Sequence, residues 1–344
     1  MIPAAQSPWQ PAAPLPRDLA PPRWQQLWRD AVRDPRALLA QLGLGEAAMG
    51  LSDAAAAQFP LRVPQGFVAR MRHGDPHDPL LRQVLPLDDE MRPMPGFSRD
   101  AVGDGDAKAG DGVIRKYRGR ALLITTGSCA VHCRYCFRRH FPYAEETAAA
   151  AGWRDAIETI RADHTIDEVI LSGGDPWSLA TAKLAELTQA LAGIAHLKRL
   201  RVHTRLPVVL PERVDAALLD WLAALPWPIT IVLHANHANE FDADVDAAVA
   251  KLRGTGAMLL NQAVLLRGVN DSVEALADLS QRSHAAGVLP YYLHQLDRVD
   301  GAAHFEVDDA RARQLHTALA ARLSGYLVPK LVREVAGDAG KRPL

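Results

Sequence analysis

The stretch RALLITTGSCAVHCRYC, residues 120–136, decides the fold. Its part ALLIT, at 121–125, is a short apolar run of the kind that forms a buried strand, and a loop with three cysteines follows it directly. Similar strand patterns, each followed by a helical pattern, recur at 167–173, 197–204, 228–234, 257–266 and 289–297. This alternation predicts βα units and a parallel sheet.

The repeat indicates the α/β class. Six predicted βα units are fewer than the eight of a closed barrel, so we expect a partial (β/α)6 TIM-like barrel, although a doubly wound sheet also fits. We assign 1–112 to an N-terminal helical region and linker, 113–325 to the barrel and 326–344 to a C-terminal segment. In both folds the functional residues lie at the carboxyl ends of the strands, where we expect the cysteine loop.

The composition indicates a globular protein with a sizeable core, because 48% of the 344 residues are hydrophobic and 23% are charged. The net charge of −1 gives no basic field, so we expect no nucleic-acid partner. No uninterrupted apolar run has a bilayer-spanning length, and the Pro- and Ala-rich start lacks the pattern of a signal peptide. We therefore expect a cytoplasmic protein without a membrane partner.

The cysteines indicate metal chemistry. Cys129, Cys133 and Cys136 are the only cysteines of the chain, whereas a disulfide framework needs pairs spread along the sequence. Three thiolates would leave one iron of a [4Fe–4S] cluster without a protein ligand, and an open position is typical of a catalytic metal. The alternatives are a zinc site completed by His132 or His140, or buried thiols without a metal.

The spacing CxxxCxxC after the first strand of a partial barrel resembles the signature of the radical S-adenosylmethionine superfamily. The resemblance implies that the open iron binds S-adenosylmethionine, and that an electron from a donor such as flavodoxin produces an adenosyl radical. It also implies that the turn Ser172, Gly173, Gly174 and Asp175 binds the methionine part of this cofactor. The alternative is an ordinary βα turn in which Asp175 caps a helix.

Residues 120–344 resemble one family of that superfamily, the lysine 2,3-aminomutases. The shared stretches are CRYCFRR, LSGGDP, HTRLPVVLPERV, HANHANE, NQAVLLRGVND, YYLHQLD and GYLVP. This resemblance implies pyridoxal phosphate as a further cofactor, and the active site of an isomerase.

The resemblance also implies residues for pyridoxal phosphate, which needs a lysine for covalent attachment and cations for its phosphate. Lys341 stands where the family has the cofactor lysine, and only seven of the 39 basic residues are lysines. Lys330 is the alternative, and a lysine so near the end of the sequence can also be a solvated surface residue. Arg120 matches the phosphate-binding position, with Lys116 and Tyr117 nearby.

Further residues are implied for the substrate. Arg138 corresponds to the arginine that binds the substrate carboxylate, which a planar guanidinium can bind in bidentate fashion. Asp297 and Glu334 occupy the positions that bind the ε-ammonium group of lysine. The sequence departs from the family at two places, because Glu334 replaces an Asp and His294 stands where a Tyr usually flanks the cofactor.

Polar residues at other strand ends are weaker candidates. His234, His237 and Gln262 are placed to contact the adenosyl group. A structural hydrogen-bonding role is an equally good interpretation for each of them taken singly.

The implied reaction moves the amino group of L-lysine from C2 to C3 by a radical route. The wording GYLVPKLVRE and the short C-terminus resemble the branch that makes (R)-β-lysine for bacterial elongation factor P. Elongation factor P and its lysyl-transferring ligase are therefore expected functional partners. The alternatives are an aminomutase for another amino acid, such as glutamate, and a non-enzymatic metal or iron–sulfur binding module. A glutamate pocket should present a cation where Asp297 and Glu334 stand.

Overall fold

The computed structural model describes residues 22–46, 49–143 and 153–344. Its strands form one sheet whose spatial order follows the chain, from β1 to β10. The strands from β3 to β9 are all parallel to one another. They are β3 (Arg120–Thr126), β4 (Glu168–Gly173), β5 (Arg199–Thr204), β6 (Ile229–Leu233), β7 (Met258–Val264), β8 (Leu289–His294) and β9 (Lys330–Arg333).

This strand order distinguishes between the two folds that the sequence left open. A doubly wound sheet reverses its strand order at a switch point, whereas a barrel adds each strand beside the previous one. The observed order is that of a partial α/β barrel, which confirms the predicted fold class. The six βα units begin with β3 to β8, and β9 adds a seventh parallel strand.

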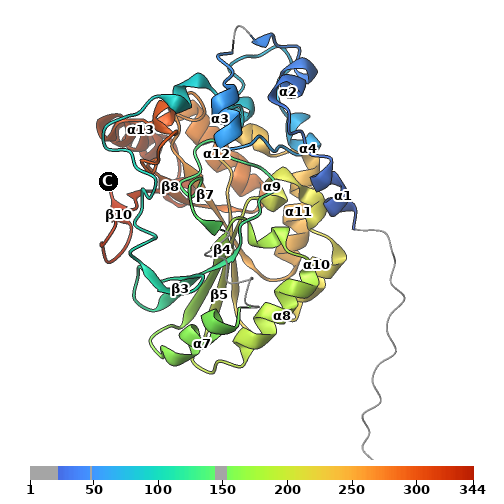
Figure 1. Ribbon diagram of the computed structural model, residues 1–344, viewed down its shortest axis with the longest axis vertical. Coiled ribbons are helices and arrows are strands. Elements are labelled where there is room, and N and C mark those ends of the chain that lie inside the picture. Colours follow the sequence, from blue (N-terminus) through green and yellow to red (C-terminus); the bar gives the residue numbers. More distant parts are fainter. Residues whose placement is uncertain (1–21, 47–48, 144–152) are drawn as a thin grey trace, which may run out of the picture.

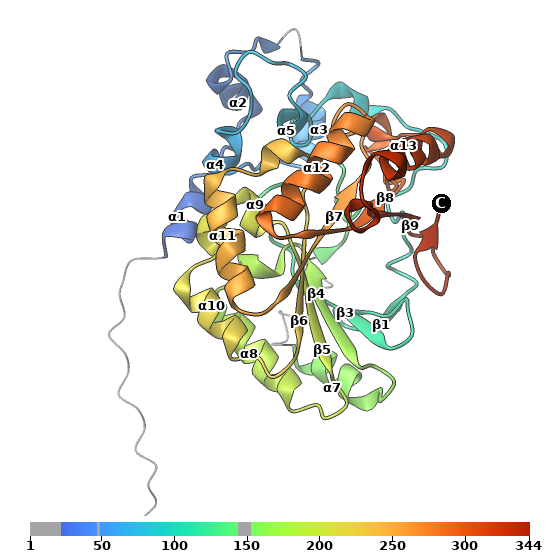
Figure 2. The same cartoon turned by 180° about the vertical axis from the view of Figure 1, so that it is seen from behind.

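Helices follow the strands and cover the outside of the sheet (Figure 1, Figure 2). The longer ones are α7 (Arg154–Ala162), α8 (Thr181–Ala192), α10 (Ala216–Ala223), α11 (Ala243–Gly254), α12 (Val273–Ala286) and α13 (Asp309–Arg322). Four of them begin with a side-chain cap that binds a free backbone N–H, from Asp215, Asp242, Ser272 and Asp308. None of the helices in the described ranges has the length and hydropathy of a bilayer-spanning segment.

The core lies between the sheet and these helices. Leu171, Val202 and Ile231 of the parallel strands are fully buried, as are Leu184 and Leu187 of α8. Strands buried on both faces are expected to be continuous apolar runs, which explains why the strand segments were recognisable in the sequence.

Short elements complete the chain. The N-terminal helices are α1 (Arg23–Arg29), α2 (Pro35–Gln41), α3 (Asp53–Gln58), α4 (Gln65–Val68) and α5 (Pro79–Arg82), and they lie at the end of the molecule opposite α7 (Figure 1). Antiparallel strands form the two edges of the sheet, namely β1 (Lys108–Gly110) with β2 (Val113–Ile114), and β10 (Arg342–Pro343) beside β9. A short α-helix, α9 (Leu206–Val209), follows β5. Single turns of 3-10 helix are η2 (Asp88–Met91), η4 (Pro176–Ser178), η5 (Pro211–Arg213), η6 (Ala238–Glu240), η7 (Ala303–Phe305) and η8 (Gly325–Leu327).

A buried ion-pair cluster attaches the N-terminal region to the cysteine loop. The Glu90 carboxylate accepts hydrogen bonds from Arg134 at 2.6 and 2.8 Å and from Arg139 at 2.7 Å. Arg134 also donates to the backbone carbonyls of Phe59 and Ala55. Since both guanidinium groups and the carboxylate are at most 1% exposed, each charge depends on its partners for solvation.

Glu90→Ala should therefore lower the free energy of unfolding by about 3–5 kcal/mol, because it leaves two buried arginines without their carboxylate. Chemical denaturation monitored by circular dichroism measures this loss. The matched control is Glu46→Ala, which breaks an exposed ion pair with Arg36 and should have a much smaller effect. Equal effects of the two substitutions would contradict the assigned role of Glu90.

Candidate active site

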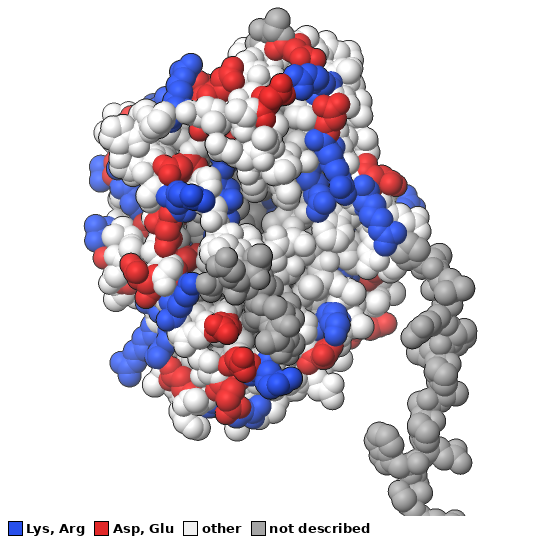
Figure 3. All heavy atoms as spheres, in the orientation of Figure 1, with Lys and Arg blue, Asp and Glu red and all other residues white. Residues whose placement is uncertain are grey.

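One cavity of about 280 Å³ opens at the carboxyl ends of the parallel strands. It is hollowed into the face shown in Figure 3, over which basic and acidic side chains are mixed. Every residue predicted for the metal, the cofactors or the substrate lines it, apart from the weaker candidate His237. These are Lys116, Tyr117, Arg120, Cys129, Cys133, Cys136, Arg138, Ser172, Gly173, Gly174, Asp175, His234, Gln262, His294, Asp297, Glu334 and Lys341.

The three cysteines lie in the loop between β3 and α7, and all are half-buried. The N-terminal region holds this loop from outside, because Trp28 and Arg62 donate to the Cys129 carbonyl at 3.2 and 3.3 Å. Burial raises the pKa of the Cys129 thiol, and it raises the pKa of the Cys136 thiol to about 11. Because cysteine binds metals as the thiolate, these thiols must release protons when a metal binds.

The two histidines considered for a zinc site do not line the cavity. His132 contacts the Pro60 carbonyl at 2.7 Å, and His140 contacts the Asp300 carbonyl at 3.1 Å. In the described part of the chain, no three His, Cys, Asp or Glu side chains gather around a single ion position. The placement of both rings therefore gives no support to a zinc site that either histidine completes.

The turn after β4 packs directly against the cysteine loop. A Cβ atom on Gly174 would lie 2.4 Å from the Ser128 carbonyl oxygen, and one on Gly173 would lie 2.6 Å from the Thr126 carbonyl oxygen. Gly173 also has a φ of +115°, which L side chains rarely adopt. The two glycines thus allow the close approach of two backbone segments, in addition to the cofactor contact that the resemblance implies for this turn.

Asp175 is engaged in the structure of this turn. Its carboxylate accepts hydrogen bonds from the Thr204 hydroxyl at 2.7 Å and from the backbone N–H groups of Trp177, Arg205 and Leu206 at 2.7–3.1 Å. This side chain therefore caps η4, as the alternative interpretation expected, and joins the turn to the end of β5. Its neighbour Ser172 donates nothing to this network and instead accepts a hydrogen bond from Arg138 at 3.2 Å.

Arg138, the predicted carboxylate-binding residue, is 7% exposed and pairs with Asp104. Its Nε atom lies 2.7 Å from Oδ2 of Asp104, and the Lys116 Nζ atom lies 2.7 Å from Oδ1 of the same carboxylate. Asp104 is itself 2% exposed. A buried carboxylate between two cations fixes the position of both side chains, and it keeps Arg138 charged in a desolvated place.

Lys341 lies among acidic groups of the same cavity, and the Lys116 ammonium that binds Asp104 is 3.7 Å from one of them, Glu334. The Lys341 Nζ atom is 3.1 Å from Oε2 of Glu334, whose Oε1 accepts a hydrogen bond from the Tyr117 hydroxyl at 2.6 Å. Burial lowers the pKa of Lys341, although Glu334 and Asp297 oppose this effect. Burial raises the pKa of Asp297 to about 7, because the nearby Lys341 offsets the desolvation only in part.

Arg120 differs from the other cations of the cavity. Its guanidinium lies 4.8 Å from the centre of the Tyr117 ring, and it has no carboxylate partner among the described residues. Arg201, by comparison, pairs with Glu168 at 2.9 Å. An arginine without a counter-charge at the wall of a cavity is suited to binding an anion such as a phosphate.

Three histidines at neighbouring strand ends lie near Lys341, and Gln262 lines the same cavity. The rings of His203 and His234 meet at 3.1 Å. Burial lowers the pKa of each histidine, to about 4 for His234 and well below its ordinary value for His203 and His294. These rings are therefore neutral at pH 7. His294 Nε2 and Gln262 Oε1 are buried without a hydrogen-bond partner in the described ranges, so both can bond to a ligand.

Two alternative residues lie away from the cavity. Lys330 is exposed at the start of β9, and His237 caps η6 by accepting a hydrogen bond from the Asn239 N–H at 3.1 Å. The structural interpretation of His237 is thus the one that its contacts support.

Among the lining residues that the sequence did not predict, four carry a charge or an imidazole ring, namely Asp104, Arg201, His203 and Arg205. The last three belong to the predicted strand at 197–204 or follow it directly, so their position was the available signal. Asp104 stands in the segment GDGD, which has the composition of a linker, and no local pattern identifies its two cationic partners.

The donor set fits the groups that the sequence implied. Three thiols at one wall suit an iron–sulfur cluster with an open iron, because each thiolate of such a cluster binds a different iron atom. A half-buried lysine, an arginine without a carboxylate partner and two unpartnered polar atoms suit a phosphorylated aldehyde cofactor.

Comparison with known proteins shows extensive similarity to lysine 2,3-aminomutases. The chain is 48% identical over 322 residues to "L-lysine 2,3-aminomutase" of Escherichia coli (strain K12), covering 93% of this chain and 94% of that protein. It is 45% identical over 318 residues to the protein of that name from Haemophilus influenzae, covering 92% and 94%. The Clostridium subterminale protein of that name is 32% identical over 271 residues, covering 78% and 65%.

Other comparisons add little. No family model matches the chain. Among solved structures, a radical SAM methyltransferase from Sphaerobacter thermophilus aligns with a TM-score of 0.43 at 21% identity, covering 64% of this chain and 68% of that one.

The raised pKa of Asp297 predicts a pH-dependent effect on stability. An ordinary unfolded Asp titrates near pH 3.9. Between that pH and about 7 the folded chain retains a proton that the unfolded chain releases, so this carboxyl lowers stability as the pH rises. Asp297→Asn removes the effect. The free energy of unfolding of the variant, minus that of the unsubstituted protein, should therefore increase from pH 5 to pH 8. Chemical denaturation of both cofactor-free proteins at each pH measures this difference.

The control is Asp220→Asn on the exposed side of α10, outside the cavity. A stability difference for Asp297→Asn that stays constant or falls over this pH range would show that Asp297 is not held protonated by its surroundings.

Proposed function

The chain belongs to the L-lysine 2,3-aminomutase family, and on this premise we propose that it converts L-lysine to (R)-β-lysine, using a [4Fe–4S] cluster, S-adenosylmethionine and pyridoxal phosphate. Members of the family are isomerases. The observation that carries the proposal is that three thiols, a half-buried lysine and two carboxylates share one cavity.

Each cofactor has residues suited to hold it. Cys129, Cys133 and Cys136 would hold three irons of the cluster, and Lys341 would hold pyridoxal phosphate with Arg120 at its phosphate. When bound, the cluster and S-adenosylmethionine supply a carbon-centred radical, and pyridoxal phosphate supplies a carbonyl group and a conjugated ring. Because burial lowers the pKa of Lys341, its amine is more readily available in the neutral form that attacks a carbonyl.

The carboxylates give the cavity a preference for a substrate with a second amino group. Glu334 now binds the Lys341 ammonium at 3.1 Å, and Asp297 lies near the same group. Glu334 and Asp297 would therefore be suited to the ε-ammonium of a lysine substrate when Lys341 holds the cofactor, and Arg138 would be suited to the substrate carboxylate. A glutamate substrate would bring a further negative charge to these carboxylates, so they favour lysine.

The walls of the cavity also position the reactants. The Asp104 carboxylate fixes Arg138, and the neutral rings of His203, His234 and His294 add no charge beside the lysine. Enclosure in a largely buried cavity holds the reacting groups close together and limits the access of water to a reactive radical.

We propose further that the product serves the modification of elongation factor P. The support is the resemblance of the segment GYLVPKLVRE, at 325–334, to the branch with that role. The proposal includes a cytoplasmic location, an electron donor such as flavodoxin, and the division of the chain at residues 112 and 325. Anaerobic incubation of the chain with L-lysine, S-adenosylmethionine, pyridoxal phosphate and dithionite, followed by elongation factor P, the lysyl-transferring ligase and ATP, should add one β-lysyl group. Mass spectrometry detects the addition, and hydrolysis with chiral chromatography distinguishes β-lysine from its isomer lysine.

Anaerobic turnover of L-lysine with S-adenosylmethionine, pyridoxal phosphate and dithionite tests the main proposal, with the product resolved on a chiral column. We expect (R)-β-lysine from lysine and no β-glutamate from glutamate. A non-enzymatic iron–sulfur module would give neither product.

Lys341→Ala should abolish turnover and remove the visible absorption of protein-bound pyridoxal phosphate, while the iron content stays unchanged. Lys330→Ala is the matched control, since Lys330 is exposed outside the cavity and should leave the absorption intact. Persistence of the absorption in Lys341→Ala, together with its loss in Lys330→Ala, would reverse the assignment.

A further inference from the structure

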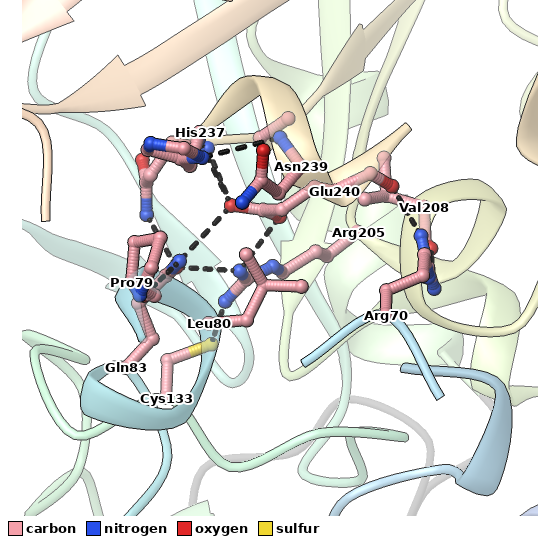
Figure 4. Close-up of polar contacts among 12 residues, drawn as sticks. Arg70, Pro79, Leu80, Gln83, Cys133, Arg205, Val208, His237, Asn239 and Glu240 are labelled. Atoms are coloured by element: carbon pink, nitrogen blue, oxygen red, sulfur yellow. Dashed lines mark hydrogen bonds and ion pairs between the residues drawn. The ribbon is translucent and has the colours of Figure 1, made fainter. Parts of the chain in front are cut away.

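A buried arginine contacts one of the three cysteines. Arg205 follows β5 and is 6% exposed. Its Nη1 atom donates to Cys133 Sγ at 2.7 Å and to the Tyr135 hydroxyl at 2.7 Å. Figure 4 shows the guanidinium lying between this sulfur and the side chain of Glu240. The cationic group therefore lies directly behind a predicted ligand of the cluster.

The other arm of the same guanidinium binds a carboxylate. Nη2 donates to Glu240 Oε2 at 2.9 Å and to Gln83 Oε1 at 2.7 Å. Glu240 is fully buried. The sulfur thus faces a desolvated ion pair whose positive end is nearer, and such charges act strongly because water does not screen them.

Glu240 is held in place by its second oxygen. Oε1 accepts hydrogen bonds from the backbone N–H groups of Asn236 and His237 at 2.8 and 3.1 Å, and from the Gln83 side chain at 3.1 Å (Figure 4). The carboxylate cannot move to solvent without breaking these bonds. The distance from Arg205 to the sulfur is therefore fixed by the fold.

Among the described residues, Arg205 is the cation that donates a hydrogen bond to a cysteine sulfur. The Tyr135 hydroxyl also contacts the Cys133 sulfur, whereas Cys129 and Cys136 have the backbone N–H groups of Asp175 and Arg138 beside them. A buried ion pair such as Arg205–Glu240 is also costly to desolvate. Stability alone therefore does not explain why this pair lies at the Cys133 sulfur.

We propose that Arg205 is a positioning residue that raises the reduction potential of the cluster through Cys133, and that Glu240 limits this rise. The inference rests on the proposed function, because it requires the cluster. One electron from an external reductant makes the cluster and its thiolates more negative. A hydrogen bond and a positive charge at a ligand sulfur stabilise that reduced state, since the potential depends on both. The Glu240 charge acts in the opposite direction from a greater distance.

The two members of the pair therefore predict opposite shifts. Arg205→Gln removes the cation, so the potential should fall by at least the amount that changes the reduced-to-oxidised ratio tenfold, about 59 mV for one electron. Glu240→Gln removes the anion and leaves Arg205, so the potential should rise. The measurement is a dithionite titration of the full chain, reconstituted anaerobically, followed by the electron paramagnetic resonance signal of the reduced cluster.

Two further variants separate this role from a structural one. Arg205→Lys keeps the charge and should remain nearer to the unsubstituted protein than Arg205→Gln. Arg213→Gln removes an equally buried arginine that binds the carbonyls of Trp177 and Leu179 and no cysteine, so it should leave the potential unchanged.

Unchanged potentials in both Arg205→Gln and Glu240→Gln, or shifts of both in the same direction, would overturn the inference. If Arg205→Gln does not retain iron, Glu240→Gln decides, because a potential that does not rise contradicts the assigned role of the pair. Failure of the unsubstituted chain to form any cluster would instead contradict the proposed function itself.

Discussion

The close approach of two backbone turns is the constraint on which the site depends. Gly174 leaves no room for a Cβ atom beside the Ser128 carbonyl, so the loop after β3 and the turn after β4 lie in direct contact. Asp175 then joins this pair of turns to the end of β5 through three hydrogen bonds. The cysteines, Arg138 and Arg205 are thereby held by three successive strands, and none depends on a loop alone.

Apart from Arg120, the cations of the cavity are already paired with carboxylates in the described part of the chain. Lys341 is bound to Glu334, and Arg138 to Asp104. Burying these charges without partners would be costly, so the cavity without ligands satisfies each of them internally. A charged ligand that binds here must replace a partner within the chain. The net binding free energy is then the difference between that of the ion pair with the ligand and that of the internal ion pair. Such an arrangement favours selectivity over affinity.

Much of the fold and the site could be predicted from the sequence, because the signals were local. Buried parallel strands are continuous apolar runs, and Cys129, Cys133 and Cys136 lie within one loop. The resemblance placed Lys341 and Glu334, which also meet across a short hairpin. Asp104 was missed because its partners are defined only by the fold. The packing of the turn after β4 against the cysteine loop could not be predicted either. Its glycines make room for backbone carbonyls that lie more than 40 residues earlier in the sequence.

The edge strand β10 is two residues long and follows Lys341 directly. Separating β10 from β9 costs far less free energy than unfolding the barrel, because the pairing is so short. If β10 separated, Lys341 would leave the cavity together with this strand. A covalently attached cofactor whose phosphate is bound elsewhere in the cavity ties this edge to the interior. Under the proposed function, loading of the cofactor thus also protects the last strand of the sheet from proteolysis and amide exchange, and each turnover that releases Lys341 briefly removes that protection.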